Sequence, residues 1–240
     1  MNISKLLQTV ALTMILGACA TTAPAPDYQA LLAAPDRSEA DRATDKRRDP
    51  LDLLKFYDLR PGMTVADLGA IGGYNTELLA RAVAPGGKVY AQNDRAYASR
   101  IAERMKAPAM KNVIAVARNF DDPLPPEARN LDAVVFNFFY HDTVNMPVDR
   151  AKMNRAVFNA LKKGGVYIVA DHSARPGAGT ADTKTLHRIE DATLRREVEA
   201  AGFQLAAEGL FLRNPQDPRT GPVFKSPIPN DEFVYKFVKP

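Results

Sequence analysis

The three histidines of the chain lie in predicted loops, each of which follows a predicted strand, and two of them stand next to an aspartate. His141 is followed by Asp142, and His172 is preceded by Asp171. His187 ends a segment that is rich in Gly, Pro and Thr. Because imidazole titrates near neutral pH, either His/Asp pair can act as a general base toward an acceptor hydroxyl. The candidate catalytic residues are therefore His141, Asp142, Asp171 and His172.

Two other roles remain open for these side chains. They could bind a metal ion through imidazole and carboxylate ligands, or they could only hold loops through hydrogen bonds. We predict no metal site, because no His-x-His or His-x₃-His pair supplies two ligands from one element. The single cysteine, Cys19, excludes both an internal disulfide and a cysteine-based zinc cluster.

A glycine-rich turn at residues 69–73 is the second feature that could bind a ligand. An apolar run precedes it and a helical pattern follows it. Glycine lets the main chain approach a ligand closely, and the start of a helix offers unpaired N–H groups. A polar pair follows about 20 residues later, where a mononucleotide-binding half carries its ribose-binding group. The predicted cofactor-binding residues are Asp67, Gly69, Gly72, Gly73, Asn93 and Asp94. The alternative is a packing turn without a ligand.

The elements that must position these residues alternate between strands and helices. The predicted strands are Thr64–Leu68, Lys88–Gln92, Val113–Ala117, Leu131–Phe138, Val166–Ala170, Phe203–Glu208 and Glu232–Val238, and the predicted helices are Asn75–Ala84, Arg95–Lys106, Pro147–Leu161 and Ile189–Ala201. Residues 27–55 also look helical, in pieces broken by Pro35 and Pro50. This alternation predicts an α/β fold, a Rossmann-like, doubly wound and mostly parallel sheet of about seven strands with helices on both faces. Ligands bind at the carboxyl ends of such strands, so we expect the two His/Asp pairs to converge there.

Residues 67–74 (DLGAIGGY) resemble the first motif of the class I S-adenosylmethionine-dependent methyltransferases. Residues 162–165 resemble the LKPGG segment of that superfamily, Asp132 fits the start of its fourth strand, and residues 201–203 match its AGF entry to strand six. The resemblance covers residues 50–240. It implies S-adenosylmethionine as the cofactor and methyl transfer to an unidentified, small-molecule acceptor. The segments around His141, His172 and His187 resemble a bacterial group of predicted methyltransferases.

The sequence departs from the superfamily pattern at two positions. Ile71 stands where such enzymes usually have a glycine, and Asn93 occupies the position of a ribose-binding acid. We expect both departures to lower cofactor affinity. Asp94 is adjacent to Asn93, although neighbouring residues of an extended segment point in opposite directions.

The N-terminus reads as an export signal. Residues 1–18 combine Lys5 with a short apolar run, and the run ends in a segment that resembles the bacterial lipobox before Cys19. An ordinary cleaved signal peptide and an uncleaved amphipathic helix are the alternatives. The predicted organisation is a lipoprotein-type signal at 1–18, a tether and helical segment at 19–49, and the methyltransferase-like domain at 50–240. We therefore expect an exported protein, periplasmic or anchored in a bacterial envelope by a lipid on Cys19.

The charge of the chain argues against nucleic acid as a partner. The formal net charge is +4 over 240 residues, with no dense basic stripe. We expect a small-molecule substrate, no nucleic acid, and membrane contact only through the lipid on Cys19; the sequence does not indicate an oligomeric state. An exported protein meets little S-adenosylmethionine. The alternative function is therefore an exported ligand-binding or interaction domain that kept the fold without catalysis.

Overall fold

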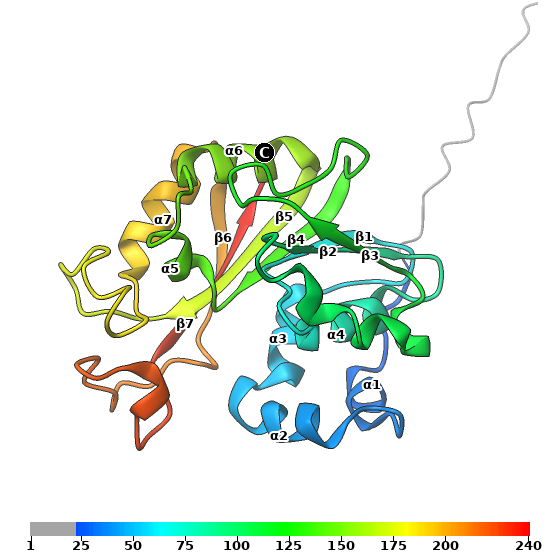
Figure 1. Ribbon diagram of the computed structural model, residues 1–240, viewed down its shortest axis with the longest axis horizontal. Coiled ribbons are helices and arrows are strands. Elements are labelled where there is room, and N and C mark those ends of the chain that lie inside the picture. The colour runs from blue at the N-terminus through cyan, green and yellow to red at the C-terminus, as the bar shows by residue number, and fades with distance from the viewer. Residues whose placement is uncertain (1–22) are drawn as a thin grey trace, which may run out of the picture.

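Seven strands form one sheet in the computed structural model, which describes residues 23–240 (Figure 1). The spatial order is β3-β2-β1-β4-β5-β7-β6, with β7 antiparallel to both of its neighbours and the other pairs parallel. The strands are β1 Thr64–Leu68, β2 Lys88–Asn93, β3 Val113–Ala117, β4 Leu131–Asn137, β5 Leu161–His172, β6 Gln204–Gly209 and β7 Glu232–Val238. The α/β prediction of a mostly parallel, seven-stranded sheet is confirmed. The predicted signal at residues 1–18 and the lipidation site Cys19 lie outside the described residues.

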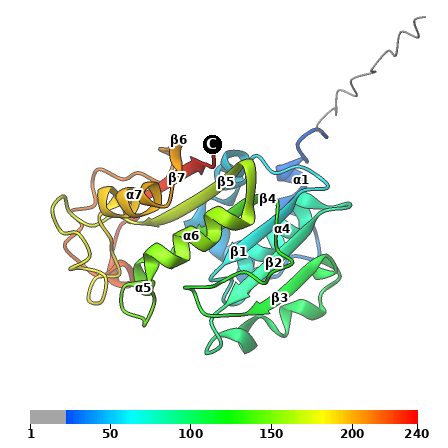
Figure 2. The same ribbon diagram turned by 90° about the horizontal axis from the view of Figure 1, so that it is seen from above.

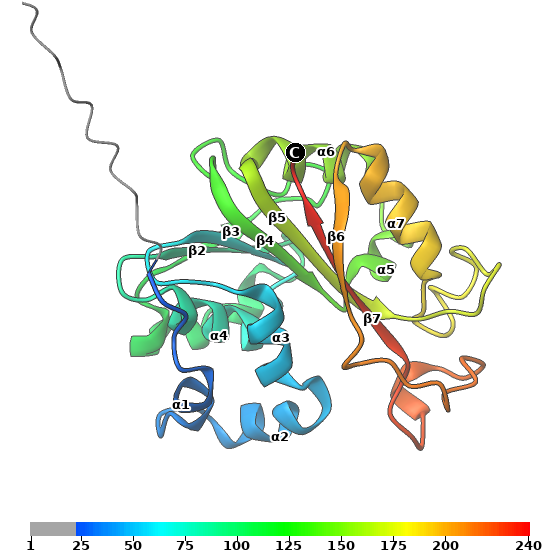
Figure 3. The same cartoon turned by 180° about the vertical axis from the view of Figure 1, so that it is seen from behind.

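Helices cover both faces of this sheet, as Figures 2 and 3 show. They are α1 Tyr28–Ala33, α2 Glu39–Arg48, α3 Pro50–Tyr57, α4 Tyr74–Val83, α5 Tyr140–Thr143, α6 Arg150–Ala160 and α7 Asp191–Ala200. Helices α1, α3 and α4 share one apolar core with one sheet face, whereas α5, α6 and α7 share the other. None of the helices described between residues 23 and 240 has both the length and the apolar character needed to cross a bilayer.

The strand sequences explain this two-sided burial. Successive side chains of a strand point to opposite faces, so a strand with helices on both sides must be apolar almost throughout. In β1, Ala66 and Leu68 pack in the core with α6 and α7, whereas Val65 packs in the core with α3 and α4. The sheet is therefore doubly wound, as predicted.

The predicted helix at residues 95–106 is wrong. The segment instead forms three short 3₁₀ turns, at Ala98–Ile101, Arg104–Lys106 and Pro108–Met110. A proline disfavours helical geometry in the residue before it, and Ala107 accordingly has an extended conformation before Pro108. The turns bury Ile101, which packs against the start of α4.

The predicted setting of the two His/Asp pairs also needs correction. Asp171 and His172 are the last residues of β5 and not part of a loop, and His141 and Asp142 belong to α5, a single turn that directly follows β4. Since β4 and β5 are parallel neighbours, both pairs nevertheless stand at the same edge of the sheet, where ligands bind in such folds.

Candidate functional site

Asp67 ties the glycine-rich turn to the helix that follows it. Its carboxylate accepts hydrogen bonds from Asn75 Nδ2 at 2.9 Å and Thr76 Oγ1 at 2.6 Å, both in the first turn of α4. Burial raises the pKa of Asp67 to about 6, against the opposing effect of these two hydrogen bonds. Asp67 therefore orients the turn, which is one of the two roles expected for a carboxylate at this position.

Ile71 and Asn93 form a closed pair of hydrogen bonds across the turn. Ile71 has a φ of 47°, a left-handed conformation that is costly for a β-branched residue. Its N–H donates to Asn93 Oδ1 at 2.7 Å, and its carbonyl accepts from Asn93 Nδ2 at 3.2 Å. The carboxamide of Asn93 is thus engaged by the main chain of Ile71, while the half-buried Asp94 accepts a bond from the N–H of Ala96 at 3.0 Å. The cofactor-binding roles of Asn93 and Asp94 stay predictions.

Close packing explains two of the three glycines. Gly69 has a φ of +62°, and a Cβ there would lie 3.1 Å from the Phe136 ring. Gly73 has a φ of +80°, and a Cβ there would lie 2.8 Å from Arg104 Cδ. A Cβ on Gly72 would meet no atom within 4 Å, and Gly72 lines a cavity. Gly72 is therefore the predicted turn residue at which a larger side chain would enter that cavity without backbone strain.

This first cavity has a volume of about 330 Å³ and lies at the carboxyl ends of β1 and β4. Its walls are the glycine-rich turn, α3 and the residues that end β4. The lining includes Leu53, Leu54, Tyr57, Gly69, Ile71, Gly72, Asn137, Phe138 and Phe139. It is mainly apolar with a few polar groups, the usual character of a small-molecule site.

Arg48 supplies a positive charge to the first cavity. Its guanidinium carbon lies 3.6 Å from the centre of the Phe138 ring. Its Nη1 is buried and has no hydrogen-bond partner among residues 23–240. Burial lowers the pKa of Arg48 to about 10, so the group keeps its charge at neutral pH. A guanidinium with a buried donor that has no partner suits a carboxylate or another anionic group.

Asp171 holds His141 through two hydrogen bonds. The carboxylate lies 2.7 Å from His141 Nδ1 and accepts from the His141 N–H at 2.8 Å, and the His172 N–H donates to it at 2.8 Å. Burial opposes charge on both partners, but their mutual attraction outweighs it, so the pKa of His141 is raised and that of Asp171 is lowered. In neutral His141, the carboxylate of Asp171 favours the tautomer with the proton on Nδ1, which leaves a lone pair on Nε2.

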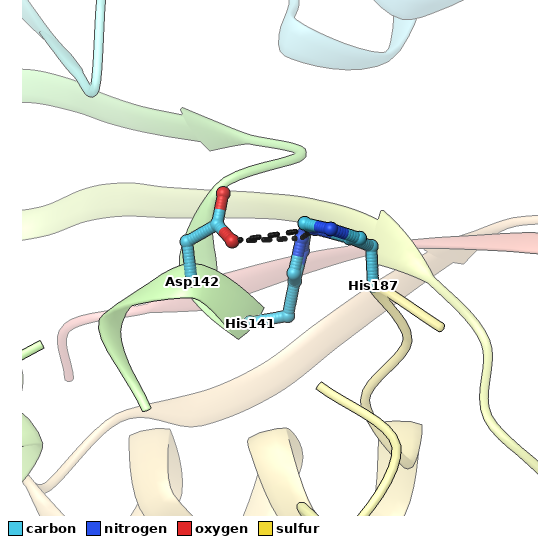
Figure 4. A group of neighbouring side chains, drawn as sticks. All are labelled: His141, Asp142 and His187. Atoms are coloured by element: carbon cyan, nitrogen blue, oxygen red, sulfur yellow. Dashed lines mark hydrogen bonds and ion pairs between the residues drawn. The ribbon is translucent and has the colours of Figure 1, made fainter. Parts of the chain in front are cut away.

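The side chains of His141, Asp142 and His187 lie close together, as Figure 4 shows. His141 Nε2 lies 3.3 Å from His187 Nδ1 and 3.4 Å from Asp142 Oδ1. His187 Nδ1 lies 3.5 Å from Asp142 Oδ1. The sequence did not predict this arrangement, because the chain has no His-x-His or His-x₃-His pair and His187 comes from the loop after β5.

His172 belongs to a second cavity of about 620 Å³. Its Nδ1 lies 2.9 Å from Glu232 Oε1, in an approach too oblique for a hydrogen bond. The cavity lies between the end of α2 and the loop that joins β6 to β7, and it also includes Lys46, Arg47 and Phe224. Glu232 was not among the site residues predicted from the sequence. It is the first residue of β7 and pairs with His172 in the antiparallel register.

Phe138 stands between the two cavities. It lines the first one, and its ring centre lies 5.2 Å from that of His172, which lines the second. Phe138 has a φ of 56°, so an aromatic residue is held in a left-handed conformation directly after β4. Strained conformations of this kind cluster at functional sites. Both Phe138 and Arg48 were outside the predicted site, because their sequence context is that of a core strand and a charged helix.

No protein-family model matches the chain. Its fold, however, matches solved structures. An S-adenosylmethionine-dependent methyltransferase from Aquifex aeolicus gives a TM-score of 0.61 at 18% identity over 80% of this chain and 90% of that one. An S-adenosylmethionine-dependent O-methyltransferase from Thermotoga maritima gives 0.54 at 18% identity over 80% and 64%. The 4+2 cyclase SpnF gives 0.59 at 16% identity over 84% and 82%. The chain has the fold of the class I methyltransferases, as its glycine-rich turn predicted.

Proposed function

We propose that the protein transfers a methyl group from S-adenosylmethionine to a small-molecule acceptor. The observation that carries this proposal is the first cavity, which is walled by the glycine-rich turn after β1 and by the end of β4. Doubly wound folds bind nucleotide-like ligands at this edge of the sheet. The fold shared with two S-adenosylmethionine-dependent methyltransferases supports the same cofactor.

On the cofactor side, we assign the turn residues to the methionine half of S-adenosylmethionine. Gly69 and Gly72 expose main chain to the cavity, and Asp67 holds the turn in position. Arg48 is the group we assign to the methionine carboxylate, because it lines this cavity and its buried Nη1 has no hydrogen-bond partner among residues 23–240. Asp94 is the carboxylate we assign to the ribose, since Asn93 is bonded to Ile71.

On the acceptor side, we assign the second cavity and the His/Asp pairs. His172 lines that cavity, and the ring centre of His141 lies 5.8 Å from that of His172. In the reaction, the bond from sulfur to the methyl carbon breaks as a bond from the acceptor atom to that carbon forms. The acceptor loses its proton, and S-adenosylhomocysteine remains. The protein's contribution is to align the two reactants and to keep the acceptor proton within reach of a base.

The second candidate is an exported ligand-binding or interaction domain without catalysis. The strained Ile71 within the turn favours it, because a branched side chain occupies space that a glycine would leave to the cofactor. The fold match to a 4+2 cyclase also supports a use of this fold other than methyl transfer. Titration with S-adenosylmethionine and S-adenosylhomocysteine separates the two: binding favours the transferase, and a folded protein that binds neither favours the alternative.

Export and lipid anchoring remain part of the proposal. The support is the apolar run of residues 1–18 and the lipobox-like segment before Cys19. Labelling cells with a radioactive fatty acid should mark the wild-type protein but not a Cys19→Ser variant. Equal absence of label from both proteins would contradict the lipid anchor.

A further inference from the structure

We propose that His141, Asp142 and His187 bind a divalent transition-metal ion of the zinc class. The three side chains form a group of potential ligands whose nearest N and O atoms lie within 4.8 Å of one another. They come from two separate elements, α5 and the loop that follows β5. This inference goes beyond the proposed function, and ion binding does not depend on methyl transfer.

The spacing of the three atoms matches a tetrahedral ion. Zinc binds nitrogen and oxygen at about 2.0–2.1 Å, so two ligands of a tetrahedral ion are separated by about 3.3–3.4 Å. The separations are 3.3 Å between the histidine nitrogens and 3.4 and 3.5 Å from these nitrogens to Asp142 Oδ1. An ion could therefore be bound with little movement of the side chains.

Asp171 prepares His141 for this role. When His141 is neutral, Asp171 accepts a hydrogen bond from Nδ1–H, and the lone pair of the ring is then on Nε2, which faces the group. A histidine that ligates a metal usually donates its other ring N–H to a carboxylate or carbonyl, which fixes the ring and its tautomer. Asp171 is fully buried and is itself held by two main-chain N–H groups. The orientation of the His141 ring is therefore fixed by Asp171 and the main chain around it.

His187 is held by the residue that follows it. The guanidinium of Arg188 is buried and donates to Asp217, to Asn230 and to the carbonyls of Ser173 and Gly221. This anchor fixes the chain next to His187, which has a φ of 54° and whose ring centre lies 5.4 Å from that of His141. A ligand on a loop needs such support to keep a productive position.

The group is open on one side. The side chains of His187 and Asp142 are 34% and 32% exposed, whereas His141 is buried. Three protein ligands with an open fourth position are typical of catalytic zinc sites, and structural sites use four protein ligands. We therefore infer that water or a substrate oxygen completes the coordination.

The ligand types indicate which ions the site prefers. Two imidazoles and one carboxylate suit zinc and the other late first-row ions, whereas magnesium and calcium prefer all-oxygen sites. The group lies near the second cavity, since the His187 ring packs edge-on against Phe224, which lines that cavity, at a centroid distance of 4.9 Å. An ion there would lower the pKa of an acceptor hydroxyl. This last consequence, unlike ion binding, rests on the proposed function.

Direct hydrogen bonding within the group is the competing explanation. His187 Nδ1–H could donate to His141 Nε2 with no ion present, because 3.3 Å permits a weak hydrogen bond. The two explanations differ in what the purified protein does with added zinc. Substitution at His187 is the informative change, because this half-exposed side chain can be replaced without disturbing the core.

The test is titration of chelator-treated protein with zinc and, separately, with cobalt, whose visible absorption reports tetrahedral nitrogen and oxygen ligands. We expect one ion per chain in the wild type and at least a tenfold weaker affinity in His187→Gln and Asp142→Asn. His172→Gln is the matched control and should keep wild-type affinity, because His172 is the histidine outside the group. Absence of stoichiometric binding, or equal binding by wild type and His187→Gln, would overturn the metal site.

A parallel titration with S-adenosylmethionine in the presence of chelator separates this proposal from the previous one. Cofactor binding without zinc binding would refute the metal site alone. Zinc binding without cofactor binding would leave the metal site standing and refute the proposed methyl transfer.

Discussion

The carboxamide of Asn93 bonds both the N–H and the carbonyl of Ile71, at 2.7 and 3.2 Å. Ile71 and Asn93, the two departures from the methyltransferase pattern, therefore form one hydrogen-bonded unit. Ile71 adopts the left-handed conformation that a glycine would take freely, and the side chain at the end of β2 stabilises it. A carboxylate could accept from the Ile71 N–H but could not donate to its carbonyl, whereas an amide does both.

Replacing Asn93 by aspartate should destabilise the fold. Asn93→Asp removes the donor to the Ile71 carbonyl and places a charge in a buried position, which costs about 1–3 kcal/mol. Urea denaturation measures the difference from wild type. Asn119→Asp is the control, because Asn119 is exposed and should change stability by less than about 0.5 kcal/mol. Equal effects of the two substitutions would show that the pair does not stabilise the turn.

Replacing Arg48 by methionine should separate stability from binding. Arg48→Met removes a desolvated charge whose buried Nη1 has no hydrogen-bond partner, so stability should stay equal or rise. Affinity for S-adenosylmethionine should fall by at least about tenfold, because a charged hydrogen bond to the methionine carboxylate contributes about 1.5–3 kcal/mol. Calorimetry checks the affinity and thermal unfolding the stability. Arg175→Met, at an exposed position, should leave both unchanged; unchanged affinity in Arg48→Met would refute the assigned contact.

Asp67 should make the stability of the protein depend on pH. Its pKa in the folded state is about 6, above its ordinary value of 3.8, so the folded state binds this proton more tightly than the unfolded state. The free energy of unfolding of wild type, relative to Asp67→Asn, should therefore be highest below pH 4. It should fall by up to about 3 kcal/mol as the pH rises through 6. Urea denaturation between pH 4 and 8 measures this difference, and a difference that does not vary with pH would contradict the raised pKa.

The buried pair of Arg188 and Asp217 should be sensitive to the loss of one partner. The two side chains lie 2.8 Å apart and are 1% and 3% exposed. Arg188→Met leaves Asp217 buried without its cation, which we expect to cost about 3–5 kcal/mol. The double variant Arg188→Met, Asp217→Leu should recover part of this loss in urea denaturation. Equal stability of the single variant and wild type would argue against this anchor of the loop that carries His187.

The strands and the glycine-rich turn were predictable because their signals are local. Apolar runs such as Leu131–Phe138 and the glycine spacing at residues 69–73 depend on the chain segment itself. The three 3₁₀ turns were not predictable as such, since Ala98–Ile101 follows a helical pattern that Pro108 interrupts only later. The conformation of residues 98–110 therefore depends on tertiary contacts, such as the packing of Ile101 in the core with α4.

The sequence predicted that the two His/Asp pairs converge, but not which other side chains would join them. The carboxyl ends of β4 and β5 brought His141 and Asp171 together, as the parallel arrangement predicted. The approach of His187 to His141 depends on how the loop after β5 folds back, and the position of Arg48 depends on where α2 ends. Neither relationship leaves a periodic signal in the sequence.

The most direct test of the central claim is calorimetric titration of S-adenosylmethionine into the protein without residues 1–18. We predict micromolar binding by wild type and at least about tenfold weaker binding by Gly72→Leu, whose side chain would enter the first cavity. Gly221→Leu is the matched control, because Gly221 also has open space around its Cβ position but lies away from this cavity. Absence of binding by folded wild-type protein, or unchanged binding by Gly72→Leu, would contradict the assignment of this cavity to the cofactor.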